Sequence, residues 1–551
     1  SWPWRILLLC LFGTSAFAVL ACTREDEAEK PREPSSSVSN EPAARGTYRR
    51  PLGNDPSSLD PARFTDIYSV AVANQIFDSL VEFDARLNIL PALARSWSAS
   101  TDGLTWTFTL RQGVKFHNGR EVIAEDVVYS LARLLDPAVQ SQFSWALTKI
   151  EGAAEFQAGR AKVPRGIRAI DRYILQITLS EPFAPLISVL GLPQLAVVPR
   201  EEVERLGTDF GLSPTGTGPF RFVHWERGQE IVLEANDHYF RGQPALDRVR
   251  FVIFPGNLVK EMLGAFERKE LEESPIPPDR RKELLESNRY TVIQKPTLSL
   301  LLFGFNLQSS PLDQLKIRQA FNYAIDKVRL NRETRGERFV LAQGILPPGM
   351  PGYNPELRAY SYDRDTAKTL LAQAGYPGGL GLPPLRWASS VKSTVARQDY
   401  RFVEQDMAQL GVQVELNEFD DWPTFQQALE QGKVQIFRYA WYADYPDPDS
   451  FLYPLFHSQS PSNYFRYRNA EVDKLLDEAR REFDDLRRVK LYREAEQVIL
   501  KDAPAVMVLH FTYEGLFQPY VEGIEVSALG ESYIPMWKIR LKPTGQENAR
   551  K

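Results

Sequence analysis

The segment 434–451 constrains the fold more than any other part of this chain. It begins with a short apolar run, residues 434–437, which has the length and composition of a buried strand. Directly after this run come an arginine, several aromatic rings and a carboxylate, in the order Arg438-Tyr439-Ala440-Trp441-Tyr442-Ala443-Asp444. A buried strand that ends in such groups is typical of an open α/β sheet, in which ligands lie just beyond the strand ends.

Side chains of this segment suit a ligand that carries both charges. Asp444 can hold an ammonium group, Arg438 can bind a carboxylate through its two-pronged guanidinium, and Trp441 can cover apolar surface between them. A peptide is the commonest zwitterion of this kind, and Tyr442 is a further candidate ring for its contact. The alternative interpretation is a proline-rich turn at 444–449 with ordinary aromatic packing.

The start of the chain has the pattern of an export signal. An apolar run at residues 6–21 follows Arg5, is too short for a comfortable membrane span and is succeeded at once by charged residues. We therefore expect a signal peptide at 1–21. It ends at Val19-Leu20-Ala21-Cys22, which is similar to a bacterial lipobox in which Cys22 is acylated. Residues 22–45 have a composition that cannot form a core, so we expect a disordered tether whose lipid is the sole membrane anchor.

The length and the net charge of the chain limit the number of domains and the kinds of partner that it can have. At 551 residues the chain exceeds the size of a single core, so two or three domains are expected. A net charge of −5 without a basic stripe argues against nucleic acid as a partner. We expect no cofactor and no metal, because the five histidines (His117, His224, His238, His457 and His510) are scattered without ligand spacing.

The local patterns predict mixed α/β secondary structure. Alternation with period two predicts strands at 105–110, 173–179 and 230–234. Apolar stripes with helical spacing predict helices at 316–325, 365–374, 472–483 and 486–500. The charge run at 478–485 is expected to be a solvated face.

Several motifs, in one order over about 400 residues, carry a family resemblance. They resemble those of the family 5 extracellular solute-binding proteins, the receptors of oligopeptide, dipeptide and nickel importers, and are most like the oligopeptide receptors. The motifs are Ser58-Leu59-Asp60-Pro61, Gln75 to Leu80, the block from Leu93 to Val127 with Gly113-Val114-Lys115-Phe116-His117-Asn118-Gly119, Gly216 to Phe220, Asn236 to Tyr239 and Ile317 to Asp326.

The resemblance implies a periplasmic-binding-protein-like α/β fold (type II, three-domain cluster C). Two lobes joined by crossing strands close over a ligand in the cleft, and an extra domain sits on the first lobe. Carried onto this chain, lobe I takes 46–82, 200–300 and 515–545, the extra domain takes 83–199, and lobe II takes 301–514. The expected function is a lipid-anchored receptor in the periplasm or on the outer cell surface, monomeric, which delivers short peptides to the permease subunits of an ABC importer.

The resemblance also assigns roles to single residues. It places the peptide amine on Asp444, its carboxylate on Arg438 and side-chain pockets at Trp441 and Trp422. Positions that help to hold carboxylates in some peptide receptors are Leu429 and Glu430 here, so carboxylate capture rests on Arg438 and another cation that the sequence does not identify.

Two alternatives stay open at this point. The same fold also holds oligosaccharides, opines or nickel chelates, and stacking of Trp441 and Trp422 on sugar rings would serve the first of these. An enzyme is the other class, since Asp444, Asp447 and Asp449 offer paired carboxylates for glycoside hydrolysis. The intervening prolines favour a turn that caps local amides, and no nucleophile elbow, HExxH motif or phosphate loop occurs, so we expect no enzyme.

Overall fold

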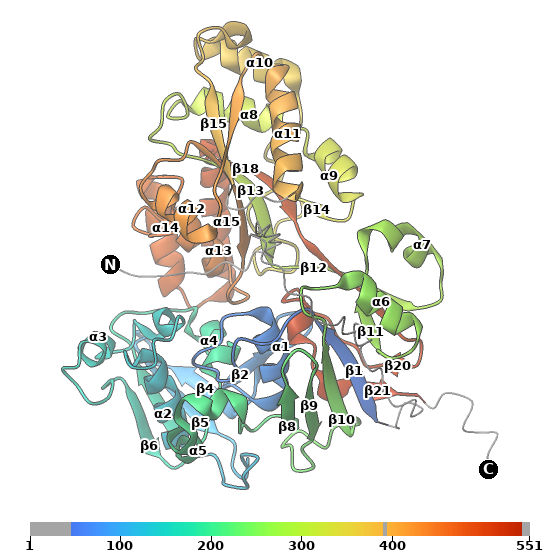
Figure 1. Cartoon of the computed structure of the whole chain (residues 1–551). Coiled ribbons are helices and arrows are strands. Elements are labelled where there is room, and N and C mark those ends of the chain that lie inside the picture. Colours follow the sequence, from blue (N-terminus) through green and yellow to red (C-terminus); the bar gives the residue numbers. More distant parts are fainter. Residues whose placement is uncertain (1–45, 390–393, 543–551) are drawn as a thin grey trace, which may run out of the picture.

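The computed structural model describes residues 46–389 and 394–542, and Figure 1 shows them as an upper and a lower lobe. The upper lobe is built on a six-stranded mixed sheet. β13 is antiparallel to both its neighbours, whereas β15 runs parallel to its own. In spatial order the strands are β14 (Val340–Leu341), β18 (Ala505–His510), β13 (Ser299–Phe305), β17 (Ile436–Tyr442), β15 (Leu385–Ser389) and β16 (Val414–Glu418).

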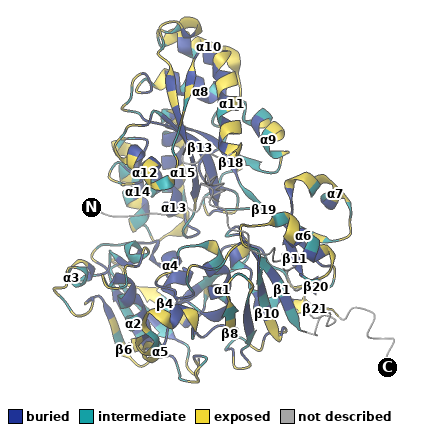
Figure 2. Ribbon diagram, viewed as in Figure 1, coloured by how far each residue is buried: buried dark blue, intermediate teal, exposed yellow. Residues whose placement is uncertain are grey.

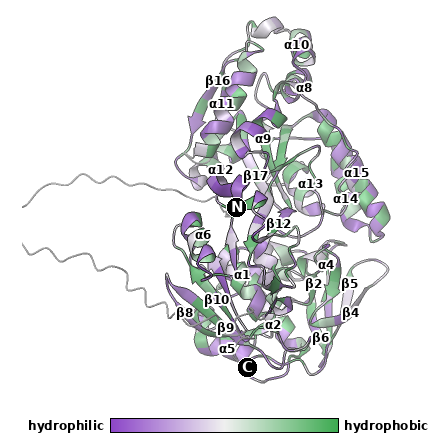
Figure 3. Ribbon diagram, turned by 90° about the vertical axis from the view of Figure 1, so that its right-hand side faces the viewer, coloured by the Kyte–Doolittle hydropathy of each residue, from purple (hydrophilic) through white to green (hydrophobic). Residues whose placement is uncertain are grey.

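Helices cover both faces of this sheet. Every residue of β13 and β18 is buried, because helices cover both faces of these strands. Such strands have a continuous apolar run in place of an alternation of apolar and polar residues. Figure 3 shows hydrophobic residues concentrated in the sheet and hydrophilic ones on outer helices such as α9. One face packs on α8 (Leu315–Ala324), α9 (Lys327–Arg335), α10 (Arg364–Gln373) and α11 (Thr394–Ala408). The other packs on α12 (Trp422–Glu430), α13 (Asp449–Phe456), α14 (Ala470–Arg481) and α15 (Asp485–Asp502).

The lower lobe contains a four-stranded and a three-stranded sheet besides the short pair of β20 (Val521–Glu522) and β21 (Arg540–Leu541). The first has the order β1 (Thr47–Leu52), β10 (Arg248–Ile253), β9 (Glu230–Ala235), β8 (Phe220–Glu226), and α1 (Ile67–Ile76) packs into its core. The second has the order β11 (Glu273–Pro275), β19 (Thr512–Phe517), β12 (Thr291–Pro296). It is accompanied by α6 (Val259–Glu267) and α7 (Arg281–Glu286).

Two adjacent strands carry the chain between the lobes. β12 leads into β13, and β18 is followed by β19, which pairs antiparallel with β12. Glu514 on β19 is almost fully buried; it accepts hydrogen bonds from Arg281 of α7 and forms an ion pair with Arg338, 3.1 Å away, from the segment between α9 and β14. The carboxylate of Glu514, on a strand that crosses between the lobes, therefore binds an arginine from each lobe.

A third unit, called the β4–β7 unit below, spans residues 94–198 and lies at the lower left of Figure 1. It follows the hairpin of β2 (Val81–Phe83) and β3 (Ile89–Pro91) and has a hydrophobic core of its own, visible as dark blue in Figure 2. Its strands are β4 (Ala94–Ala99), β5 (Thr105–Leu110), β7 (Ile174–Thr178) and β6 (Ile167–Asp171), and its helices are α2 (Ala124–Leu135), α3 (Ala153–Gln157) and α4 (Leu186–Val189).

The predicted elements are confirmed. The three predicted strands are β5, β7 and β9, and the four predicted helices are α8, α10, α14 and α15, each within two residues at either end. The signal peptide at 1–21, the tether at 22–45 and the acylation of Cys22 lie outside the described residues. Among the helices of the described ranges, none combines the length and the apolarity needed to cross a membrane. The domain boundaries stay a prediction.

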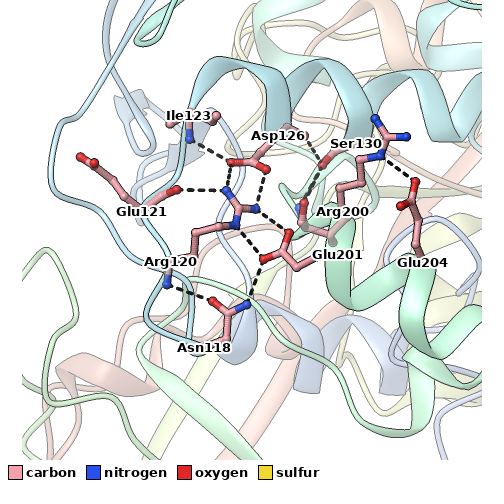
Figure 4. Close-up of polar contacts among 10 residues, drawn as sticks. Asn118, Arg120, Glu121, Ile123, Asp126, Ser130, Arg200, Glu201 and Glu204 are labelled. Carbon is pink, nitrogen blue, oxygen red and sulfur yellow. Dashed lines mark hydrogen bonds and ion pairs between the residues drawn. The ribbon is translucent and has the colours of Figure 1, made fainter.

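The block from Leu93 to Val127 is held to its neighbours by polar contacts. His117 lies within hydrogen-bonding distance of the Gly218 carbonyl (2.9 Å), and its other ring nitrogen accepts from the Gly216 amide. Arg120 binds Asp126 at the start of α2 and Glu201 on α5 (Arg200–Leu206), as Figure 4 shows. His117 and Arg120 therefore join the β4–β7 unit to the lower lobe.

Replacement of Arg120 by alanine is expected to lower the free energy of unfolding by about 1–3 kcal/mol, because the buried Asp126 carboxylate loses its charged donor. Urea denaturation measures this difference. The matched control is Arg172→Ala, which removes an exposed ion pair with Glu121 and should cost less than about 1 kcal/mol. Equal effects of the two substitutions would contradict the structural role of Arg120.

Acidification is expected to destabilise the folded chain through His117. Burial lowers the pKa of His117 to about 4, whereas the unfolded side chain binds its proton near pH 6.5. The unfolded state therefore binds more protons between these values, so stability falls as the pH drops from about 6.5 to about 4, by about 3 kcal/mol for this group. Urea denaturation of wild type and His117→Gln at pH 7 and pH 4.5 tests this. The variant should lose less stability over that interval, and parallel losses would refute the assignment.

Candidate ligand-binding site

β17 points its side chains alternately to the two faces of the upper sheet. Phe437, Tyr439 and Trp441 belong to the core beside α12 and α13, whereas Ile436 belongs to the core beside α11. Because successive residues of a strand point to opposite faces, Arg438 lies on the α11 face and Trp441 on the other. The two predicted ligand contacts are thus separated by the sheet itself.

The face with Trp441 carries a row of aromatic rings. Trp422, at the first position of α12, stacks on Tyr439 with ring centroids 6.0 Å apart, and Tyr439 lies 6.1 Å from Trp441. Trp441 is buried and its indole donates to the Ser450 carbonyl (2.7 Å). Trp422 is only half-buried, so of the two tryptophans it offers more ring surface to a ligand.

Asp444 lies two residues beyond the end of β17 and is partly buried. Its amide donates to Ser450 Oγ (2.9 Å), which fixes the backbone of the turn. Burial and the negative charge of Asp444 raise the pKa of Tyr533, so this lower-lobe residue is near the carboxylate. Tyr442, the last residue of β17, is 47% exposed and stacks on Phe511. The end of β17 therefore presents a carboxylate and an accessible ring toward the lower lobe.

Arg438 is bound to a carboxylate that sequence analysis missed. Its Nε donates to Asp399 of α11 (2.7 Å), and Arg335 at the end of α9 donates to both oxygens of the same group. Asp399 is fully buried, and both arginines are mostly buried. Two guanidinium groups on one carboxylate leave one excess positive charge. The sequence signal was present, since Asp399 falls on the buried stripe of α11.

The two other acids of the segment are committed to ion pairs. Asp447 accepts the amide of Asp449 and pairs with Arg488 of α15 at 2.6 Å. Asp449 pairs with Arg480 of α14 at 2.7 Å. The predicted turn with capped local amides is confirmed, with Asp447 as the acceptor, and neither acid is placed as a free general acid or base.

A pocket of about 120 Å³ lies in the lower lobe beside Tyr533. It is lined by the end of α1, the β2–β3 hairpin and the segment 525–538. Asp78, at its wall, accepts hydrogen bonds from Thr217 and Tyr239, and burial raises the pKa of this carboxyl to about 6. A cavity of about 150 Å³ holds one benzene ring, so this pocket has the size of one side chain. Within the described ranges, no group of three or more His, Cys, Asp or Glu side chains is placed to hold a metal ion.

The chain is similar to known proteins over nearly its whole length. It is 30% identical over 540 residues to heme-binding protein A of Haemophilus influenzae, covering 94% of this chain and 96% of that protein. It is 29% identical over 501 residues to the dipeptide-binding protein of Escherichia coli, covering 87% and 92%. Glutathione-binding proteins of Salmonella species match at 29% over 463 residues, covering 82% of this chain and 86% of those.

Solved structures confirm the predicted fold. HbpA2 from Haemophilus parasuis superposes with a TM-score of 0.81 at 26% identity, covering 90% of this chain and 100% of that one. The unliganded open form of the periplasmic murein tripeptide-binding protein MppA gives 0.79 at 26%, covering 91% and 98%. DppA from Helicobacter pylori, in complex with the peptide STSA, gives 0.72 at 27%, covering 90% and 98%.

A family model identifies the family to which this chain belongs. The model of the bacterial extracellular solute-binding proteins, family 5 (Middle), matches residues 88–463. This range contains the β4–β7 unit, β17 and the segment with Asp444, so it includes the main features of the site. The prediction of a non-catalytic protein agrees with this assignment, because the members of the family bind solutes for transport. The chain belongs to the family 5 bacterial extracellular solute-binding proteins.

Proposed function

We propose that the protein is the substrate-binding component of an ABC importer and captures short peptides outside the cytoplasm. The observation that carries the proposal is the arrangement around β17. Asp444 beyond its end suits a peptide amine, and the Arg438–Asp399–Arg335 cluster on its α11 face carries an excess positive charge that suits a carboxylate. Trp422 and Tyr442 would offer ring surface to ligand side chains, and the buried Trp441 would support Trp422 through the ring of Tyr439.

The relatives support peptides as the solute class. One is named for dipeptides and others for glutathione, a tripeptide derivative, and a solved relative contains the peptide STSA. A relative named for heme and a solved structure with agropinic acid mark the range of other solutes in the family. Main-chain hydrogen bonds and charge anchors would give broad tolerance for peptide sequence.

The proposal includes the arrangement of the chain around its ligand. The two lobes close about the strands β12 and β19. Lobe I comprises residues 46–82, 200–300 and 515–545, lobe II comprises 301–514, and the domain 83–199 sits on lobe I. The closed, liganded state differs in shape from the open state, so the permease subunits can distinguish the two. Acylation of Cys22 would hold the monomeric protein at the membrane surface.

Native mass spectrometry of residues 46–551, purified without refolding from a peptide-rich cytoplasm, tests the ligand class. The expected result is a series of bound masses that match tri- to pentapeptides. Binding of heme, a sugar or a metal chelate, with no binding of any peptide added afterwards, would overturn the proposal while leaving the family intact.

Replacement of Asp444 by asparagine should weaken binding of a free-amine peptide by about 3–5 kcal/mol, because the ammonium group loses its counter-charge in the closed site. Isothermal titration calorimetry measures the change. N-acetylated peptide is the control, because it carries no ammonium group and should bind wild type and variant within about 1 kcal/mol of each other. Equal losses for the free-amine and the N-acetylated peptide would show that Asp444 does not bind the ammonium group.

Replacement of Arg438 by methionine should remove the preference for a free carboxylate. The remaining pair of Arg335 and Asp399 is neutral, so a peptide with a free C-terminus should lose about 1.5–3 kcal/mol while its C-amide is affected less. The matched control is Arg397→Met on the same helix α11, which removes only the ion pair with Glu418. Equal losses for acid and amide would exclude Arg438 from carboxylate binding.

A further inference from the structure

The residues that follow Asp444 pack on the β4–β7 unit as well as on the upper lobe. Tyr445 is 4% exposed and belongs to the hydrophobic core of that unit. Its ring centroid lies 6.1 Å from that of Trp145, which follows α2 in the chain. Figures 1 and 3 both show the α13 region of the upper lobe directly above this unit.

Arg480 makes the second contact with the same unit. Its guanidinium donates to both oxygens of Asp449, and Asp449 also accepts the Tyr445 hydroxyl (2.7 Å). The backbone carbonyl of Arg480 accepts the amide of Ala184 (2.7 Å), and its guanidinium lies 5.5 Å from the Phe183 ring centre. Asp449 therefore ties Tyr445 and Arg480 together, and both rest on the β4–β7 unit.

The contact continues along the loop between α14 and α15. The ring of Phe483 lies 5.8 Å from that of Trp106 on β5 and covers Gly103. A Cβ atom at Gly103 would lie 2.2 Å from this ring, and the residue has a φ of +70°, so glycine is required there on both grounds. Gly103 therefore leaves room for the Phe483 ring beside β5.

We propose that the β4–β7 unit positions the ligand anchor of the upper lobe, with Trp145 as a positioning residue. This rests on the proposed role of Asp444. The contacts of Tyr445 and Arg480 fix both ends of the turn 444–449 in the arrangement in which the two lobes meet, so the β4–β7 unit holds the carboxylate in place where the ligand binds. An anchor that the protein itself holds loses less conformational entropy when it contacts the ligand, and this increases affinity without a new contact.

A double-mutant cycle of Trp145→Ala with Asp444→Asn tests the proposal. Trp145→Ala should weaken free-amine peptide binding about tenfold in the wild-type background and less than about twofold in the Asp444→Asn background, because its effect passes through that carboxylate. A merely structural role would weaken binding equally in both backgrounds. Leu486→Ala is the control, since this neighbouring side chain is 84% exposed and should change neither affinity.

Phe483→Ala provides a second variant, because its side chain is 38% exposed and its removal leaves both cores intact. It should show the same dependence on Asp444 with a smaller, about threefold, effect. If Asp444→Asn leaves peptide affinity unchanged, the proposed anchor itself is wrong. If Asp444→Asn weakens binding but neither Trp145→Ala nor Phe483→Ala does so, the positioning role alone is overturned.

Discussion

Burial of β17 on both faces is the constraint from which the arrangement of the site follows. The strand lies between β13 and β15, with helices on either side, so each of its residues must be apolar or be matched by a partner. Arg438 is the charged residue of the strand, and it is matched by the buried Asp399. Beyond Tyr442 the chain leaves the sheet and its covering helices, and it carries the partly exposed carboxylate of Asp444.

Much of this could be predicted from the sequence. The two periodicities predicted β5, β7, β9 and four helices, because a strand or helix with one buried side has a repeating pattern of its own. Alternation within β17 places Arg438 and Trp441 on opposite faces of the sheet, although the sequence analysis assigned both to one ligand. The partner of Arg438 could not be predicted, because Asp399 lies 39 residues earlier and meets it only through the packing of α11 on the sheet.

The charge run at 478–485 also contains a residue whose tertiary partner could not be predicted from the sequence. Most of it is exposed, as expected, yet Arg480 is largely buried against Asp449 and Tyr453. Sequence composition describes the run as a whole, whereas one residue in it has a partner from a turn about 30 positions away. A buried ion pair offsets its own desolvation only with good geometry, so its main effect is on which arrangement forms rather than on net stability.

Three such sets of buried charges surround the end of β17. Arg438 and Arg335 hold Asp399 on one face, while Arg488 holds Asp447 and Arg480 holds Asp449 in the turn that follows. Each pair fixes a direction as well as a distance, because a guanidinium binds a carboxylate in a plane. The side chains at the strand end are therefore ordered by groups that a ligand does not displace. In the receptor that we propose, these ion pairs keep the charge anchors in place while the lobes move, because all of the paired residues belong to the upper lobe.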